Sequence, residues 1–102
     1  MKLDLERLIA VADALGNPHR LRIVASLGRG RNYVSELARQ LGLSRPLLYM
    51  HLEKLEKAGL VKGALELSED GKAMKYYELT DFELHIDAHT IAQAVKASER
   101  GE

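Results

Sequence analysis

Two short helical patterns separated by one glycine constrain the fold of this chain more than any other feature. In the first, Val34, Leu37, Ala38 and Leu41 recur at i, i+3, i+4 and i+7, the spacing of one face of a helix. Gly42 follows at once, so the link to the next pattern is very short. Two short helices joined so closely must cross at a sharp angle, and this predicts a helix-turn-helix over residues 34–58.

The second pattern, over residues 44–58, begins with its own start signals. Ser44 is placed to cap the helix, and Pro46 lies in the first turn, where its missing N–H is not needed. The same helical spacing then continues through Leu48, His51, Leu52 and Leu55. In a helix-turn-helix the second helix is the one that enters a groove of DNA, so residues 44–58 are expected to be a recognition helix.

The charge distribution is uneven along the chain, although the formal net charge is zero. Residues 16–62 hold nine Lys or Arg against three Glu, whereas residues 63–102 hold four against nine Asp or Glu. Attraction to phosphate depends on the field within about 10 Å at ordinary salt, more than on the total charge. The basic half coincides with the predicted helix-turn-helix, which favours duplex DNA as a partner.

Composition excludes several other classes of protein. The 102 residues suffice for one domain, with 46% apolar residues to form its core. The absence of cysteine excludes a disulfide, a thiolate metal site and a cysteine nucleophile. No apolar run approaches membrane-spanning length, and the first residues do not resemble a signal peptide, so a cytoplasmic protein without membrane contact is expected.

Helices are predicted on both sides of the central pair. Residues 2–15 carry an apolar stripe consisting of Leu5, Leu8, Ala12 and Leu15. A helix from Pro18 to about Leu27, capped by Asn17, is expected to bury Leu21, Val24 and Leu27, with Ile23 at the side. A last helix over residues 88–98 is expected to be capped by Asp87.

A β-hairpin is predicted directly after the recognition helix, over residues 60–80. Asp70-Gly71 is a strong hairpin turn signal between two strand-like segments. Phe82, Leu84 and Ile86 alternate with polar residues, which predicts that the second strand continues or that a further short strand follows. The fold class is therefore mainly α with a small β-hairpin, in one domain over residues 1–102.

These segments together resemble the ArsR-type winged helix-turn-helix regulators. The resemblance runs from about Leu15 to Thr80 and rests on LGNPHRLRIVASL, on VSELARQLGLSRPLLYMHLEKLEKAGLV and on a hairpin that ends GKAMKYYELT. It implies a homodimer paired through residues 2–15 and 88–98, with two recognition helices in successive major grooves of double-stranded DNA. It also implies a transcriptional regulator, most simply a repressor that an inducer releases. A cleft between the paired terminal helices could hold a small-molecule effector, although no residue identifies one.

The candidate DNA contacts are of two kinds. Arginines and lysines of the basic half and of the hairpin would bind phosphate, and the first turns of the recognition helix would contact bases. The set is Arg29, Arg31, Arg39, Ser44, Arg45, Pro46, Leu47, Tyr49, Met50, Lys54, Lys72 and Lys75. Glu69 and Asp70 at the hairpin tip would oppose a phosphate contact there.

The recognition helix departs from the family pattern at Leu47, Tyr49 and Met50, where the family usually places small polar side chains. Leu and Met cannot form hydrogen bonds with bases but can pack on a thymine methyl, so hydrogen bonds would rest on Arg45, Tyr49 and Lys54. The sequence leaves two alternatives open. The apolar residues could cover the edge of the core, or the face could bind a protein in a winged-helix module that has lost DNA binding.

Metal binding and catalysis are not predicted. Asp87-Ala88-His89 matches half of a metal site that some family members carry on the last helix, but Glu99, Arg100 and Glu102 do not complete it as a zinc site. No nucleophile-base pair, paired carboxylates or phosphate-binding glycine loop is present in the sequence. The chain is expected to be neither an enzyme nor dependent on a cofactor.

Overall fold

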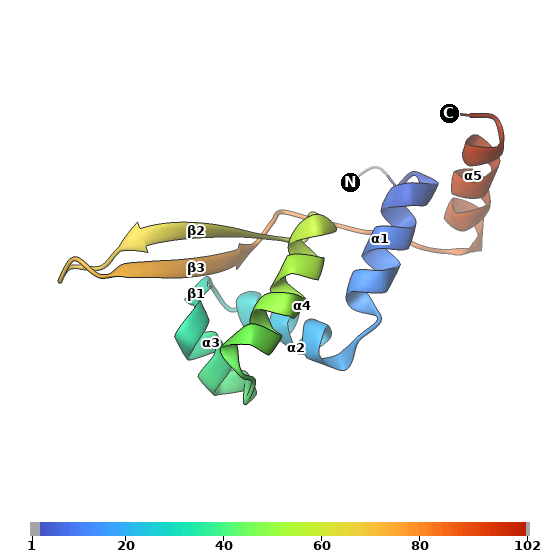
Figure 1. Cartoon of the computed structure of the whole chain (residues 1–102). Helices are drawn as coiled ribbons and strands as arrows, with labels where there is room; N and C mark the ends of the chain where they lie inside the picture. Colours follow the sequence, from blue (N-terminus) through green and yellow to red (C-terminus); the bar gives the residue numbers. More distant parts are fainter. Residues whose placement is uncertain (1–2, 102) are drawn as a thin grey trace.

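The computed structural model describes residues 3–101, and it places five helices and three strands along them (Figure 1). The helices are α1 (Leu5–Leu15), α2 (Pro18–Leu27), α3 (Val34–Leu41), α4 (Arg45–Lys57) and α5 (Ala88–Glu99). The strands are β1 (Asn32–Tyr33), β2 (Val61–Leu67) and β3 (Ala73–Leu79). They form an antiparallel sheet in the order β1-β3-β2. This is the predicted winged helix-turn-helix.

The helix-turn-helix forms where its start and stop signals predict. Gly42 ends α3 in the left-handed conformation, with φ at 66°. The N–H of Leu43 then donates to the carbonyl of Ala38 at 3.0 Å, which closes the end of the helix in a Schellman-type pattern. Ser44 caps α4 by accepting from the N–H of Leu47. Two residues therefore suffice to turn the chain from one helix into the next.

The hydrophobic core lies under α4, where helices α1 to α3 and the base of the hairpin meet. Leu48, Leu52 and Leu55 of α4 are fully buried, together with Ile23 of α2 and Leu37 of α3. The hairpin extends away from this core, and α5 lies against α1 at the other end of a molecule 55 Å long (Figure 1). The sheet and α5 are thus on opposite sides of the recognition helix.

Some residues that were predicted to be buried in α1 and α2 are exposed in the structure. Val11 and Ala14 are the buried residues of α1, whereas Ala12 is exposed. In α2, Ile23 is fully buried and Leu21 is 52% exposed, the reverse of what was predicted. Both α1 and α2 pack against several other elements, so the buried side of each is set by those neighbours and not by a single apolar stripe.

The segment after β3 is not a strand. Residues 80–87 form no helix or strand, although Phe82 and Leu84 pack against the core as the alternation suggested. β3 does not continue past Leu79, because its partner β2 begins opposite it at Val61, where the chain has only just left α4. The two-residue strand β1, which has no strand signal of its own in the sequence, fills the remaining edge of β3.

A buried polar contact fixes α4 against the first two helices. The guanidinium of Arg20, 8% exposed, donates from Nε to the carbonyl of Ala14 at 2.7 Å and from Nη2 to that of Asp13 at 3.2 Å. Its Nη1 lies 3.0 Å from Nδ1 of His51 in α4. Since the guanidinium can only donate, Nδ1 accepts, and the neutral ring carries its proton on Nε2. Burial, followed by the charges of Arg20 and His19, lowers the pKa of His51.

Leu52→Ala should destabilise the fold by about 2–5 kcal/mol, because it removes most of a fully buried side chain from the centre of the core. Leu67→Ala is the matched control, since Leu67 is 76% exposed near the hairpin tip and should change stability by less than about 0.5 kcal/mol. Urea denaturation of the two variants checks this. Equal losses of stability for the two variants would contradict the assigned core.

Stability should fall as the pH drops below about 6.5, the unfolded-state value for histidine. The pKa of His51 is lowered in the native state, so the unfolded chain takes up a proton that the native state excludes. The stability that depends on the neutral form of His51 is therefore complete above the unfolded-state pKa and is lost as the pH falls through the native-state pKa. Urea midpoints between pH 8 and pH 5 measure it. His51→Asn, which keeps an acceptor for Arg20, should flatten the profile.

Candidate nucleic-acid interface

Nine of the twelve predicted contact residues lie at the start of α4, within α4 or in the hairpin, and the other three, Arg29, Arg31 and Arg39, lie outside both. All twelve are exposed except Lys75, which is half-buried. Ser44, Arg45 and Pro46 begin α4, and Leu47, Tyr49 and Met50 follow on its outer side, between 37% and 50% exposed. Arg29 lies in the exposed turn after α2. The helix therefore presents side chains to a partner over its first two turns.

A groove of about 300 Å³ lies between α4 and the hairpin, and it brings predicted residues from both elements together. Arg45 and Tyr49 line it from α4, while Lys75 and Leu65 line it from the hairpin. Leu65 pairs with Lys75 in the β2–β3 register, so both point from the same face of the sheet. The ammonium of Lys75 lies 5.6 Å from the ring centre of Tyr77. In this groove the N-terminal half of α4 and the hairpin face that carries Lys75 share one surface.

Leu65, Tyr33 and Ser35 also line this groove, and none of them was predicted from the sequence. Leu65 could have been found by counting the strand register back from Asp70-Gly71, because residues opposite Lys75 share its face. No comparable signal marks Tyr33 and Ser35. They reach the groove because β1 carries the start of α3 to the sheet.

Four of the predicted cations are already paired with carboxylates of the same chain, and one of them is Lys72, 4.0 Å from Asp70 near the hairpin tip. Arg31 bonds both oxygens of Glu66 and stacks over the ring of Tyr76, 4.4 Å from its centre, on the hairpin face opposite to Lys75. Arg39 bonds Glu36 on α3. The ammonium of Lys54 lies 3.0 Å from a carboxylate oxygen of Asp13 in α1.

These ion pairs are exposed to solvent, and in three of them the cation lowers the pKa of its acidic partner. Hydrogen bonds and charge from Arg31, Arg39 and Lys54 lower the pKa of Glu66, Glu36 and Asp13 respectively. Exposed ion pairs contribute little to stability, since water and salt compete for both partners. A phosphate could therefore take the place of these carboxylates. By contrast, Arg29 and Arg45 form no ion pair with a carboxylate within residues 3–101.

The terminal helices carry an exposed apolar surface of their own. Ile9 of α1 is 60% exposed, and Ile91 and Val95 of α5 are 43% and 38% exposed. Helix α5 lies wholly within the described residues, and Ala94 is its single buried side chain. A helix of this length gains most of its stability from packing, so one buried alanine leaves its apolar face without a partner in the monomer.

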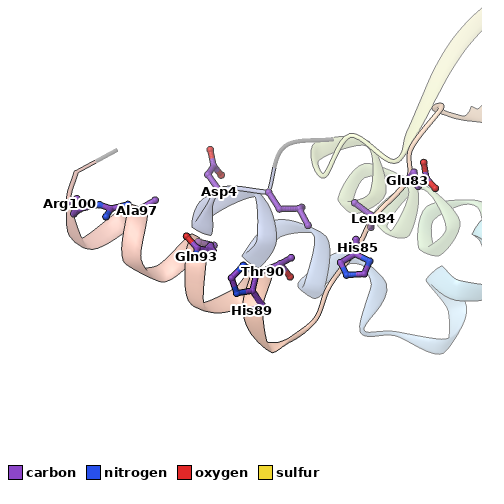
Figure 2. A pocket seen from close by; sticks show the side chains of 11 residues that line it. Asp4, Glu83, Leu84, His85, His89, Thr90, Gln93, Ala97 and Arg100 are labelled. Atoms are coloured by element: carbon purple, nitrogen blue, oxygen red, sulfur yellow. The ribbon is translucent and has the colours of Figure 1, made fainter.

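Beside this surface lies an open groove of about 840 Å³ between α1, α5 and the segment before α5 (Figure 2). His85, His89 and Thr90 line it, as does Gln93 on the next turn of α5. Asp87 caps α5 by accepting from the N–H of Thr90, and its other oxygen lies 2.9 Å from Nε2 of His85. These hydrogen bonds, with that to Thr90 the strongest, lower the pKa of Asp87 to about 2. Asp87 therefore acts as a helix cap, as predicted.

Neither a metal site nor a membrane span is present in the described part of the chain. Residues 3–101 contain no group of three or more His, Cys, Asp or Glu side chains that could hold a metal ion. Within the same residues no helix is both long and apolar enough to cross a bilayer.

Comparisons with known proteins agree with this geometry. The family model described as bacterial regulatory protein, arsR family, matches residues 17–62. An uncharacterized HTH-type transcriptional regulator of Methanocaldococcus jannaschii is 39% identical over 89 residues, which cover 87% of this chain and 93% of that protein.

Solved structures share the fold over nearly the whole chain. HlyU from Vibrio cholerae matches with a TM-score of 0.65 and 23% identity, covering 100% of both chains. A homodimeric winged helix-turn-helix DNA-binding domain from Mycobacterium bovis, Mb0332, matches with a TM-score of 0.67 and 22% identity, covering 95% of this chain and 80% of that one. At these identities the likeness concerns the fold alone.

Proposed function

The chain belongs to the ArsR family of transcriptional regulators, and we propose that it acts as a homodimeric repressor of specific promoters. Members of this family have a winged helix-turn-helix DNA-binding domain and are not enzymes. One observation carries the proposal. The N-terminal half of α4 and the hairpin face that carries Lys75 line a common open groove. A duplex that receives α4 in its major groove would meet phosphates along that hairpin face.

The proposed DNA contacts fall into groups according to whether the side chain already forms an ion pair. Arg29 and Arg45, which form no ion pair among the described residues, and Lys75 would bind phosphate first. Arg31, Arg39 and Lys54 would need to exchange a carboxylate for a phosphate. Lys72 is near the tip, 4.0 Å from Asp70, so it would contribute less. Base contacts would come from residues 44–50, the exposed first turns of α4.

The dimer is proposed to form through α1 and α5. Their exposed apolar side chains, Ile9, Ile91 and Val95, are the residues that a second copy would cover, and the adjoining open groove would be closed by the same contact. Pairing at this end leaves both copies of α4 free. Two recognition helices then require half-sites about one helical turn apart, about 34 Å. Repression is the simplest output, because occupancy of such a site excludes other proteins from it.

A protein-interaction module is the second candidate function, and the exposed Leu47 and Met50 favour it. Such a module would bind no duplex. Retention on random duplex DNA in a gel shift at low salt therefore separates the two functions.

Lys75→Ala and Lys62→Ala test the assigned hairpin face. The two lysines lie on opposite faces of the hairpin, since Lys75 pairs with Leu65 and Lys62 pairs with Glu78. Lys75→Ala should weaken duplex binding and reduce the slope of log affinity against log salt by about 0.9, the value of one phosphate contact. Fluorescence anisotropy at several salt concentrations measures both. Arg45→Ala should behave like Lys75→Ala, whereas Lys62→Ala, at a lysine outside the predicted contact set, should reduce the slope less than Lys75→Ala does. Binding that responded to neither salt nor Arg45→Ala would end the proposal.

Ile91→Glu should convert the dimer to a monomer, because two charges would be buried in an interface that the wild type fills with apolar side chains. Leu21→Glu serves as control. Leu21 is similarly exposed but lies on α2, away from α1–α5, so that variant should remain dimeric. Light scattering after size exclusion gives the masses. A dimer that survived Ile91→Glu would show that another surface mediates assembly.

A further inference from the structure

The outer side of the first two turns of α4 is apolar over a continuous strip. Leu47 is 37% exposed and Met50 is 50% exposed. They are three residues apart in the helix, so their side chains are neighbours on one face. Pro46, the exposed residue just before them, offers no side-chain hydrogen bond either. Ser44 precedes the strip, where its hydroxyl oxygen accepts from the N–H of Leu47 as the cap of α4.

The polar side chains of α4 lie to either side of this strip or are engaged elsewhere. Arg45 and Tyr49 line the groove toward the hairpin. On the other flank, Lys54 is held by Asp13 of α1. The carboxylate of Glu53 lies 3.2 Å from the ammonium of Lys57 and could only accept a hydrogen bond. The strip therefore has no donor of its own with which to contact a base.

An apolar strip in a major groove has few partners with which it can gain free energy. The thymine methyl is the one apolar group on the major-groove edges of the four bases. Packing on it buries apolar surface on both sides. Packing on guanine, adenine or cytosine edges instead would cover hydrogen-bonding groups and leave them without partners, which is costly. The strip would thus favour thymine and disfavour the other bases at the same positions.

We propose that Leu47 and Met50 select thymine methyl groups in each half-site, as the specificity contacts at the centre of the recognition helix. The inference rests on the proposed function, since it needs α4 in the major groove. Arg45 and Tyr49 then add hydrogen bonds on the hairpin side of the same helix. The half-site is expected to contain a thymine at each position that faces the strip, on either strand.

Uracil substitution tests this directly, because uracil keeps every hydrogen-bonding group of thymine and lacks only the methyl. Duplexes that bind the full chain are first selected from a randomised pool. Each thymine of the selected site is then replaced by uracil, one at a time, and binding is measured by anisotropy. One or two replacements per half-site should each weaken binding about threefold to fivefold, the worth of one buried methyl.

Variants assign the effect to the strip. In Leu47→Ala and in Met50→Ala, the penalty for uracil should disappear at one position each, while the thymine duplex itself binds more weakly. Leu21→Ala is the matched control, because Leu21 is an exposed leucine on α2, and it should keep the wild-type penalties. Unchanged urea midpoints for all three variants, expected for exposed sites, would show that folding is intact.

The outcomes distinguish this inference from the function on which it rests. Salt-dependent binding that is equally tight for thymine and all-uracil duplexes would overturn the inference and leave the DNA-binding function standing. So would uracil penalties that persist at full size in the double variant Leu47→Ala/Met50→Ala. A chain that bound no duplex at low salt would overturn both, and the strip would then belong to a protein interface.

Discussion

The position of the recognition helix depends on one buried guanidinium. Arg20 lies inside the domain, and a charge there is tolerated only because carbonyl oxygens and a ring nitrogen surround it. The two carbonyls are those of Asp13 and Ala14 at the C-terminal end of α1, the negative end of that helix dipole. The third partner is His51, in the middle of α4. One side chain from α2 thus ties the helix proposed for dimerisation to the helix proposed for DNA contact. The proposed assembly and the proposed recognition would then be linked through it.

The sequence predicted the parts of this fold that are governed by local chemistry. Gly42 is the residue that can end α3 in a left-handed conformation, Ser44 and Asp87 are good caps, and Asp70-Gly71 makes a tight turn. The buried face of α4 was also predicted, because that helix lies across the core and a single apolar stripe is enough to orient it. For the same reason the place of the candidate interface followed from the sequence.

Features set by distant contacts could not be predicted in the same way. The burial of Ile23 over Leu21 depends on how α2 meets α3 and α4, and a ten-residue helix with mixed polarity does not reveal that. The alternation over residues 82–86 marks one side facing the core, but a strand also needs a partner, and β2, the partner of β3, begins only at Val61, opposite Leu79. The partners of Arg31 and Lys54 lie 35 and 41 residues away in sequence. Only the folded chain shows that these cations are already engaged.

The internal ion pairs have a consequence for how the protein would tell its own site from bulk DNA. Glu66, Glu36 and Asp13 act as tethered competitors for the cations beside them. A duplex that meets the surface in a poor register cannot displace them, so it would be held only by Arg29, Arg45 and Lys75. A site in full register would engage all six cations. If these cations bind phosphate as proposed, the carboxylates would lower the affinity for the vast excess of unrelated sequence more than for the correct site, and acidic residues that never contact a base would raise discrimination.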